Sequence, residues 1–75
     1  VNNFYIIDKD DGIFKKGMRC YCFAYSETHI FLYFEKEVIS GIHEVKLPKN
    51  KLYLLKDSKP LDSDPLMCYI IYTKG

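Results

Sequence analysis

The sequence contains no tryptophan, only three prolines and four glycines, and no long hydrophobic run. Its longest strongly apolar segment, residues 67–72, is far shorter than the roughly 20 residues that a membrane-spanning helix needs. No positively charged stretch followed by an apolar one opens the chain, as a secretory signal would. We therefore expect a soluble protein with no membrane partner.

Neither sign of charge is in large excess. Eleven Lys and Arg stand against ten Asp and Glu, which gives a net charge of +1. So small a net charge creates no overall field that would attract nucleic acid or acidic lipid. Binding to nucleic acid would therefore have to depend on a local basic patch.

The sequence has only three cysteines, an odd number: Cys20, Cys22 and Cys68. An odd set does not form a disulfide framework, which favours a reducing, cytoplasmic location. Cys20 and Cys22 with His29 and His43 contain the residue types that bind zinc, but they lack the two spaced ligand pairs of a zinc site. We interpret the cysteines as buried structural thiols and expect no metal or other cofactor.

Catalytic motifs are lacking as well. The chain has no paired carboxylates, nucleophile elbow or phosphate-binding loop. A cysteine–histidine pair would need a thiol with a depressed pKa and a third group that orients the histidine, and the sequence marks neither. The sequence predicts that the protein is not an enzyme.

Aromatic residues, in contrast, are abundant, with seven Tyr and five Phe in 75 residues. A chain of this length forms one domain, residues 1–75, and buries only about 60% of the surface that its unfolded form exposes. No segment shows a sustained helical period, so the protein is predicted to be nearly all β. The predicted strands are residues 3–8, a hairpin over 18–34, residues 38–47, residues 52–55 as a strand or 3-10 turn, and an additional C-terminal strand at 66–74. Between the last two, residues 56–65 form a predicted exposed loop with two prolines and three aspartates.

The hairpin over residues 18–34 organises these elements. Residues 26–29 are its only polar break. With a tight loop on Glu27 and Thr28, the alternation of side chains in a strand predicts two apolar faces. The first face pairs Tyr25 with Ile30, Phe23 with Leu32, and Tyr21 with Phe34. The second carries Met18, Cys20, Cys22, Ala24, Phe31 and Tyr33. A shift in register would change these partners but would leave both faces apolar.

Over residues 4–55 the order of turns resembles that of the small SH3-like barrels. Lys15-Lys16-Gly17 precedes the second strand, Gly41 interrupts the fourth, and Pro48 leads to a short Leu-rich segment. The resemblance implies an all-β barrel of five to six strands, with an OB-like barrel as the alternative. It also implies that the second face of the hairpin points inward. Recognition of polyproline peptides is not implied, because the tryptophan of SH3 peptide binders is missing.

These observations lead to two functional hypotheses. The preferred one is a non-enzymatic protein-interaction module, a small adaptor or inhibitor encoded by a phage or mobile element. It would bind a protein partner or a second copy of itself through a strand edge or the first face of the hairpin. The predicted partner-binding residues are Tyr21, Phe23, Tyr25, Ile30, Leu32 and Phe34. The alternative is a barrel that binds single-stranded nucleic acid through Lys15, Lys16 and Arg19 beside the aromatic rings.

Overall fold

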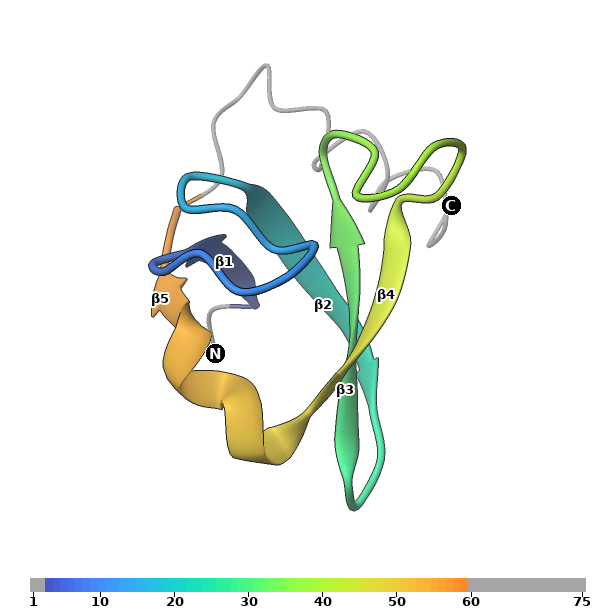
Figure 1. Ribbon diagram of the computed structural model, residues 1–75. Helices are drawn as coiled ribbons and strands as arrows, with labels where there is room; N and C mark the ends of the chain where they lie inside the picture. Colours follow the sequence, from blue (N-terminus) through green and yellow to red (C-terminus); the bar gives the residue numbers. More distant parts are fainter. Residues whose placement is uncertain (1–2, 60–75) are drawn as a thin grey trace.

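The computed structural model describes residues 3–59, which form one curled sheet of five antiparallel strands (Figure 1). The elements are β1 (Phe4–Ile7), β2 (Arg19–Tyr25), β3 (His29–Phe34), β4 (Glu44–Pro48), the 3-10 helix η1 (Lys49–Leu54) and β5 (Leu55–Asp57). The strand order across the sheet is β4-β3-β2-β1-β5. The prediction of a small all-β, barrel-like fold is confirmed, and the strand order is compatible with an SH3-like barrel.

Two turn residues act as predicted. Gly17 has a φ of +96° directly before β2, a conformation that side chains with a Cβ rarely adopt. Pro48 is the last residue of β4 and is followed by η1 and β5. Because proline has no N–H group, it cannot extend the backbone ladder of the strand. Of the two alternatives for residues 52–55, the 3-10 turn is the one present up to Leu54.

Two predicted boundaries need correction. Residues 38–43 do not belong to the fourth strand, because they form a tight turn in which the Val38 N–H donates to the Ile42 oxygen at 2.8 Å. Gly41, with a φ of +78°, allows this reversal. β5 extends to Asp57, so the predicted loop at 56–65 begins later than expected. Ser58 and Lys59 follow β5 without belonging to a strand, and residues 60–65 of the predicted loop and the predicted strand at 66–74 lie outside the described residues.

A β-bulge at Phe23 changes the predicted register of the hairpin. The loop residues are as expected, and Tyr25 lies opposite Ile30. Beyond the bulge, however, Cys22 lies opposite Leu32 and Cys20 opposite Phe34, so the predicted pairs of Phe23 with Leu32 and Tyr21 with Phe34 are wrong. The cause is the extra residue in β2, which shifts every pair on one side of it by one position.

This shift reassigns the two faces of the hairpin. The core is a single cluster on the inner face of the curled sheet, made of Ile7, Phe14, Cys20, Ile30, Leu32, Phe34, Leu47 and Leu54. Leu32 and Phe34 are completely buried, although the sequence prediction placed them on the partner-binding face. Conversely, Phe31 and Tyr33 lie opposite Ala24 and Tyr21 on the other face of the sheet.

Candidate functional site

Two cross-strand rows of side chains cover the face of the sheet opposite the core, which we call the outer face. Residues that lie directly opposite each other in neighbouring strands share one face of the sheet. The proximal row runs across four strands and consists of Phe4, Tyr21, Tyr33 and Glu44. The distal row, nearer the hairpin loop, consists of Ala24, Phe31 and Lys46.

The proximal row is largely shielded from solvent. Phe4 and Tyr21 are only 9% and 7% exposed, and their ring centroids are 5.1 Å apart. Next to them Tyr33 is half-buried and stacks on His43, with ring centroids 5.3 Å apart and an angle of 10° between the planes. Little of this row is therefore open to a partner from outside.

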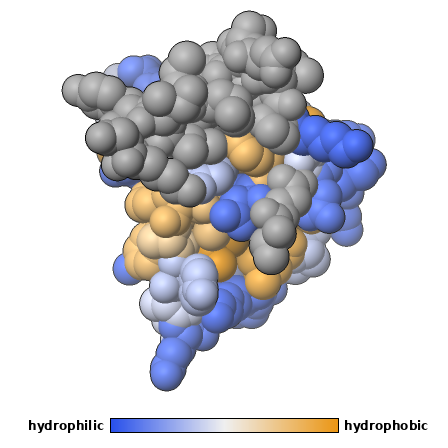
Figure 2. Space-filling view, turned by 180° about the vertical axis from the view of Figure 1, so that it is seen from behind, coloured by the Kyte–Doolittle hydropathy of each residue, from blue (hydrophilic) through white to orange (hydrophobic). Residues whose placement is uncertain are grey.

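The distal row differs, because apolar side chains around it remain accessible. Phe23 is 39% exposed, and its ring contacts that of Phe31 at a centroid distance of 6.3 Å. Ala24 is exposed and Phe31 is half-buried. We call Phe23, Ala24 and Phe31 the distal patch. On the side of the molecule shown in Figure 2, hydrophobic surface is bordered by hydrophilic surface.

A shallow pocket of about 230 Å³ lies along β2 beside this patch. It is lined by Asn3, Tyr21, Cys22, Phe23, Ala24 and Tyr25. β1 reaches only to the first part of this strand, since the N–H of Cys22 donates to the Asn3 oxygen at 2.9 Å and the register with β1 covers Arg19 to Tyr21. The pocket thus lies where β2 extends past β1.

Tyr25 is the most exposed large hydrophobic residue among residues 3–59, at 78%. It lies opposite Ile30, which belongs to the core cluster, so its position in the register is on the inner side of the sheet. The ammonium group of Lys49 lies 6.0 Å from the centre of its ring. Tyr25 therefore lies beside the beginning of η1 and is separate from the distal patch.

The six predicted partner-binding residues thus do not form one surface. Ile30, Leu32 and Phe34 belong to the core, where they are 8%, 0% and 0% exposed. Tyr21 is buried in the proximal row, and only Phe23 and Tyr25 are exposed. The sequence prediction missed Phe31 and Ala24 as members of the accessible patch. The sequence indicated only that the pairs of the hairpin depend on its register. A glycine within a strand often marks a bulge, but the residue at this bulge is Phe23.

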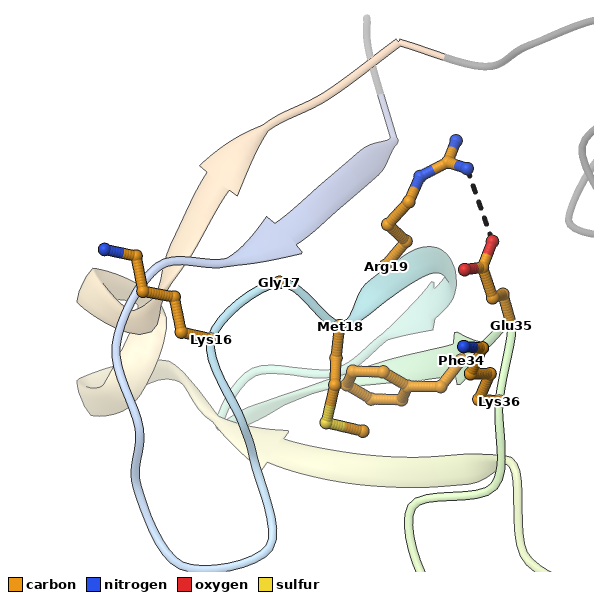
Figure 3. Close-up of a pocket in the computed structure, with 7 residues that line it drawn as sticks. All are labelled: Lys16, Gly17, Met18, Arg19, Phe34, Glu35 and Lys36. Carbon is orange, nitrogen blue, oxygen red and sulfur yellow. Dashed lines mark hydrogen bonds and ion pairs between the residues drawn. The ribbon is translucent and has the colours of Figure 1, made fainter.

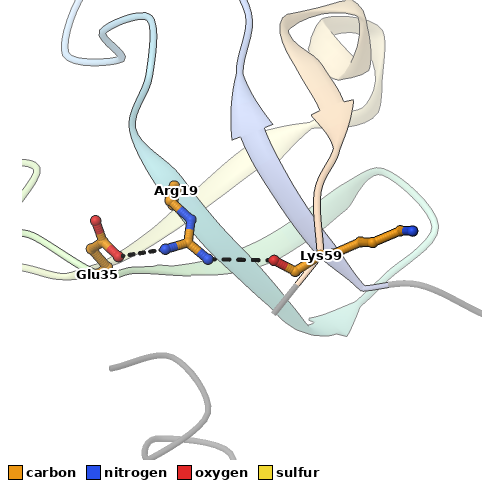
Figure 4. Close-up of polar contacts among 3 residues, drawn as sticks. All are labelled: Arg19, Glu35 and Lys59. Atoms are coloured by element: carbon orange, nitrogen blue, oxygen red, sulfur yellow. Dashed lines mark hydrogen bonds and ion pairs between the residues drawn. The ribbon is translucent and has the colours of Figure 1, made fainter. Parts of the chain in front are cut away.

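The three basic residues of the nucleic-acid hypothesis are not equally available. Lys15 and Lys16 are exposed. Arg19, in contrast, forms a salt bridge with Glu35, with 3.3 Å between Nη1 and Oε2, and its Nη2 donates to the Lys59 oxygen at 3.5 Å (Figure 4). Its guanidinium is therefore already engaged within the protein.

Lys16 and Arg19 both line a pocket of about 260 Å³. The other lining residues are Gly17, Met18, Phe34, Glu35 and Lys36. In Figure 3 the side chains of Lys16 and Arg19 extend in different directions. Because the two cations do not converge on one point, the geometry does not single out a phosphate position. Binding of single-stranded nucleic acid stays a prediction.

The thiols of β2 have different environments. Cys20 is completely buried, and burial, with a smaller effect of the neighbouring Cys22, raises its pKa from an ordinary value of 9.0 to about 12. This agrees with its interpretation as a structural thiol. Cys22 is half-buried, and its thiol donates to the Ala24 oxygen at 3.3 Å. Because the pKa of the Cys20 thiol is so high, Cys20 is not a nucleophile at neutral pH.

The two histidines make different contacts. His29 contacts the Thr28 hydroxyl through Nδ1 at 2.8 Å, in the hairpin loop. His43 contacts the Phe34 carbonyl oxygen through Nδ1 at 3.0 Å. Among residues 3–59, no three His, Cys, Asp or Glu side chains lie together in a way that could hold a metal ion.

The described part of the chain also has no helix with the length and apolarity that crossing a membrane requires.

Comparisons with known proteins identify no relative. No protein-family model matches the sequence, and searches of curated proteins and of solved structures find no significant match. A function can therefore be inferred only from the geometry of the described surface.

Proposed function

We propose that the protein is a non-enzymatic interaction module with an SH3-like barrel, and that it binds a protein partner through the distal patch. The observation that carries this proposal is the exposure of Phe23, which is 39% exposed at the bulge of β2 beside the half-buried Phe31. The bulge directs this ring outward, whereas an uninterrupted strand would place it opposite Leu32 in the core register.

The distal patch has the composition of a small binding surface. Fully burying an exposed Phe side chain contributes about 1.5–3 kcal/mol, of which Phe23, at 39% exposed, has the smaller part still to gain. A few such anchors supply most of the affinity in protein interfaces. The pocket along β2 lies directly next to Phe23 and Ala24, so an apolar side chain of the partner has a recess to fill. A small adaptor or inhibitor needs no more than such a contact surface.

Lys46 indicates the chemistry of the partner. It is exposed and lies opposite Phe31 in the distal row. A cation at the margin of an apolar patch favours a partner with an acidic residue next to its apolar anchor, because complementary charges at the rim speed association and exclude wrong partners. We therefore propose a partner surface that is apolar at its centre and acidic at its edge.

The test compares the wild type with Phe23→Asp and with the control Ile39→Asp. Ile39 is 48% exposed in the β3–β4 turn, so its substitution adds the same charge at an exposed hydrophobic position away from the patch. Each tagged protein is used to capture proteins from cells of its source, and a captured protein is then purified and titrated by calorimetry. We expect Phe23→Asp to weaken binding at least about tenfold and Ile39→Asp to leave it within about twofold.

Circular dichroism should show that both variants remain folded. Equal affinity of the wild type and Phe23→Asp, or the absence of any saturable binder, would contradict the proposal. Sedimentation equilibrium adds one further distinction. A dimer that Phe23→Asp dissociates and Ile39→Asp does not would identify a second copy of the chain as the partner.

A further inference from the structure

Tyr25 and Tyr53 are the two most exposed aromatic side chains among residues 3–59, at 78% and 59%. Neither belongs to the core cluster or to the distal patch. An aromatic ring that stays in water forgoes the stability that its burial would supply. Their exposure therefore adds little to the fold and leaves both rings accessible to a ligand.

Both tyrosines lie along η1. The N–H of Lys49, the first residue of η1, donates to the Thr28 oxygen at 2.9 Å, so the end of the hairpin that carries Tyr25 is fixed to the beginning of η1. Tyr53 lies in η1 itself, four residues after Lys49. At about 2 Å per residue in a 3-10 helix, this separation is about 8 Å along the helix axis. A nucleic-acid strand advances by about 3.4 Å per nucleotide, so about two to three nucleotides cover it.

Each of the two rings has a lysine beside it. The ammonium group of Lys49 is 6.0 Å from the centre of the Tyr25 ring, and that of Lys9 is 5.8 Å from the centre of the Tyr53 ring. All four side chains are exposed. Because a ring has two faces, a lysine against one face leaves the other for a base. Proteins that bind single-stranded nucleic acid combine such rings, on which bases stack, with cations that attract the phosphates.

The charge along η1 is most positive at its beginning. η1 contains Lys49 and Lys51 and no acidic residue. Lys51 is paired with Asp11, with 3.4 Å between Nζ and Oδ2, so its charge is offset. Lys9 stands between two aspartates in the sequence, whereas both sequence neighbours of Lys49 are uncharged. A phosphate is therefore attracted more strongly to Lys49 than to Lys9.

We propose that Tyr25, Lys49 and Tyr53 form a second surface, which binds single-stranded nucleic acid by stacking bases on the two rings. Lys49 holds the backbone of the strand at the Tyr25 end, and Lys9 contributes less at the other end. This surface does not include the basic residues before β2 that the sequence suggested. It is also independent of the distal patch, because Tyr25 lies on the inner side of the sheet in the register and the patch surrounds the outer row.

The probe is a fluorescent oligothymidylate of about ten nucleotides, and its binding is measured by fluorescence anisotropy. We expect Tyr25→Ala and Tyr53→Ala each to weaken binding about fivefold or more, because each removes a ring on which a base stacks. Tyr25→Phe keeps the ring and should bind like the wild type. Ile39→Ala, which shortens an exposed apolar side chain in the β3–β4 turn, is the control and should change the affinity less than about twofold. Circular dichroism shows whether each variant is folded.

Repeating the titration between about 50 and 200 mM salt measures the phosphate contacts. Lys49→Ala should reduce the slope of log affinity against log salt concentration by about 0.7, and the exposed control Lys36→Ala should leave it unchanged. The absence of saturable binding at low salt, equal weakening by Tyr25→Ala and Ile39→Ala, or a reduced slope in Lys15→Ala instead of Lys49→Ala would each overturn the proposal. Equal affinity for polyglutamate would overturn it too, and would assign the surface to acidic proteins.

Discussion

Phe23 contacts Phe31 across the hairpin at a ring-centroid distance of 6.3 Å, although the residue directly opposite Phe31 is Ala24. The contact exists because Phe23 is the extra residue of a bulge and lies next to the regular pair. It brings two aromatic rings to the outer face and leaves Leu32 to the core.

The first prediction concerns the two faces of β3 and the bulge. We expect Leu32→Ala to lower the free energy of unfolding by about 2–5 kcal/mol, because it opens a cavity in the core. Phe23→Ala should lower it by only about 1 kcal/mol, because its ring is partly exposed. Urea unfolding followed by circular dichroism measures both. Similar losses in the two variants would show that Phe23 is a core residue.

The second prediction concerns Gly17. Gly17→Ala should destabilise the protein by about 1–2 kcal/mol, since alanine must adopt a positive φ there. A Cβ at this position meets no atom within 4 Å, so the loss measures backbone strain rather than crowding. Ser40→Ala, an exposed turn residue, is the control and should change stability little. An unchanged melting temperature in Gly17→Ala would mean that the loop before β2 adopts another conformation.

The third prediction concerns the loop between β1 and β2. The Asp10 carboxylate accepts a hydrogen bond from the backbone N–H of Lys16 at 2.7 Å. We expect Asp10→Ala to lower the free energy of unfolding by about 1 kcal/mol, because the net contribution of a hydrogen bond to stability is about that large. Asp8→Ala, two residues earlier in the same loop, is the matched control. Thermal unfolding of both variants checks this, and an equal effect would show that the contact itself contributes nothing.

The fourth prediction concerns alkaline pH. Burial raises the pKa of Cys20 from 9.0 to about 12, so the folded state holds the thiol proton more tightly than the unfolded state. The resulting stability is complete below pH 9 and is lost as the pH rises towards 12. Its full size is roughly 4 kcal/mol. Tyr5, whose pKa is also raised mainly by burial, acts in the same direction above pH 10.

Urea unfolding between pH 8 and pH 11 measures this effect. Cys20→Ala should be less stable at pH 8 but should show a shallower fall with pH. Cys22→Ala, which removes the half-buried thiol, should keep most of the wild-type slope. Identical slopes in all three proteins would rule out Cys20 as the source of the pH dependence.

Local signals in the sequence were sufficient for much of the fold. Gly17 before β2 and Pro48 at the end of β4 have the roles that their backbone chemistry predicts. The polar residues at the hairpin loop correctly placed Tyr25 opposite Ile30. These predictions succeed because each depends on neighbouring residues only.

The candidate site was less predictable because it depends on a nonlocal feature. Both strands of the hairpin are apolar on both faces, so hydrophobic alternation does not choose a register. The register depends on how Leu32 and Phe34 pack in the core. In the register that buries them, Phe23 forms a bulge. One inserted residue in β2 therefore separates Tyr21 and Phe23 from the core face of β3, with which the prediction had paired them.

The position of β1 between β2 and β5 also has a consequence for the order of folding. β2, β3 and β4 pair with their neighbours in sequence, so these hairpins need only short loops to close. β1 pairs with β5 through Tyr5 and Asp57, which stand near opposite ends of the described chain. The meander of β2, β3 and β4 is therefore expected to form early. A chain still being synthesised cannot close its sheet until residue 57 has left the ribosome.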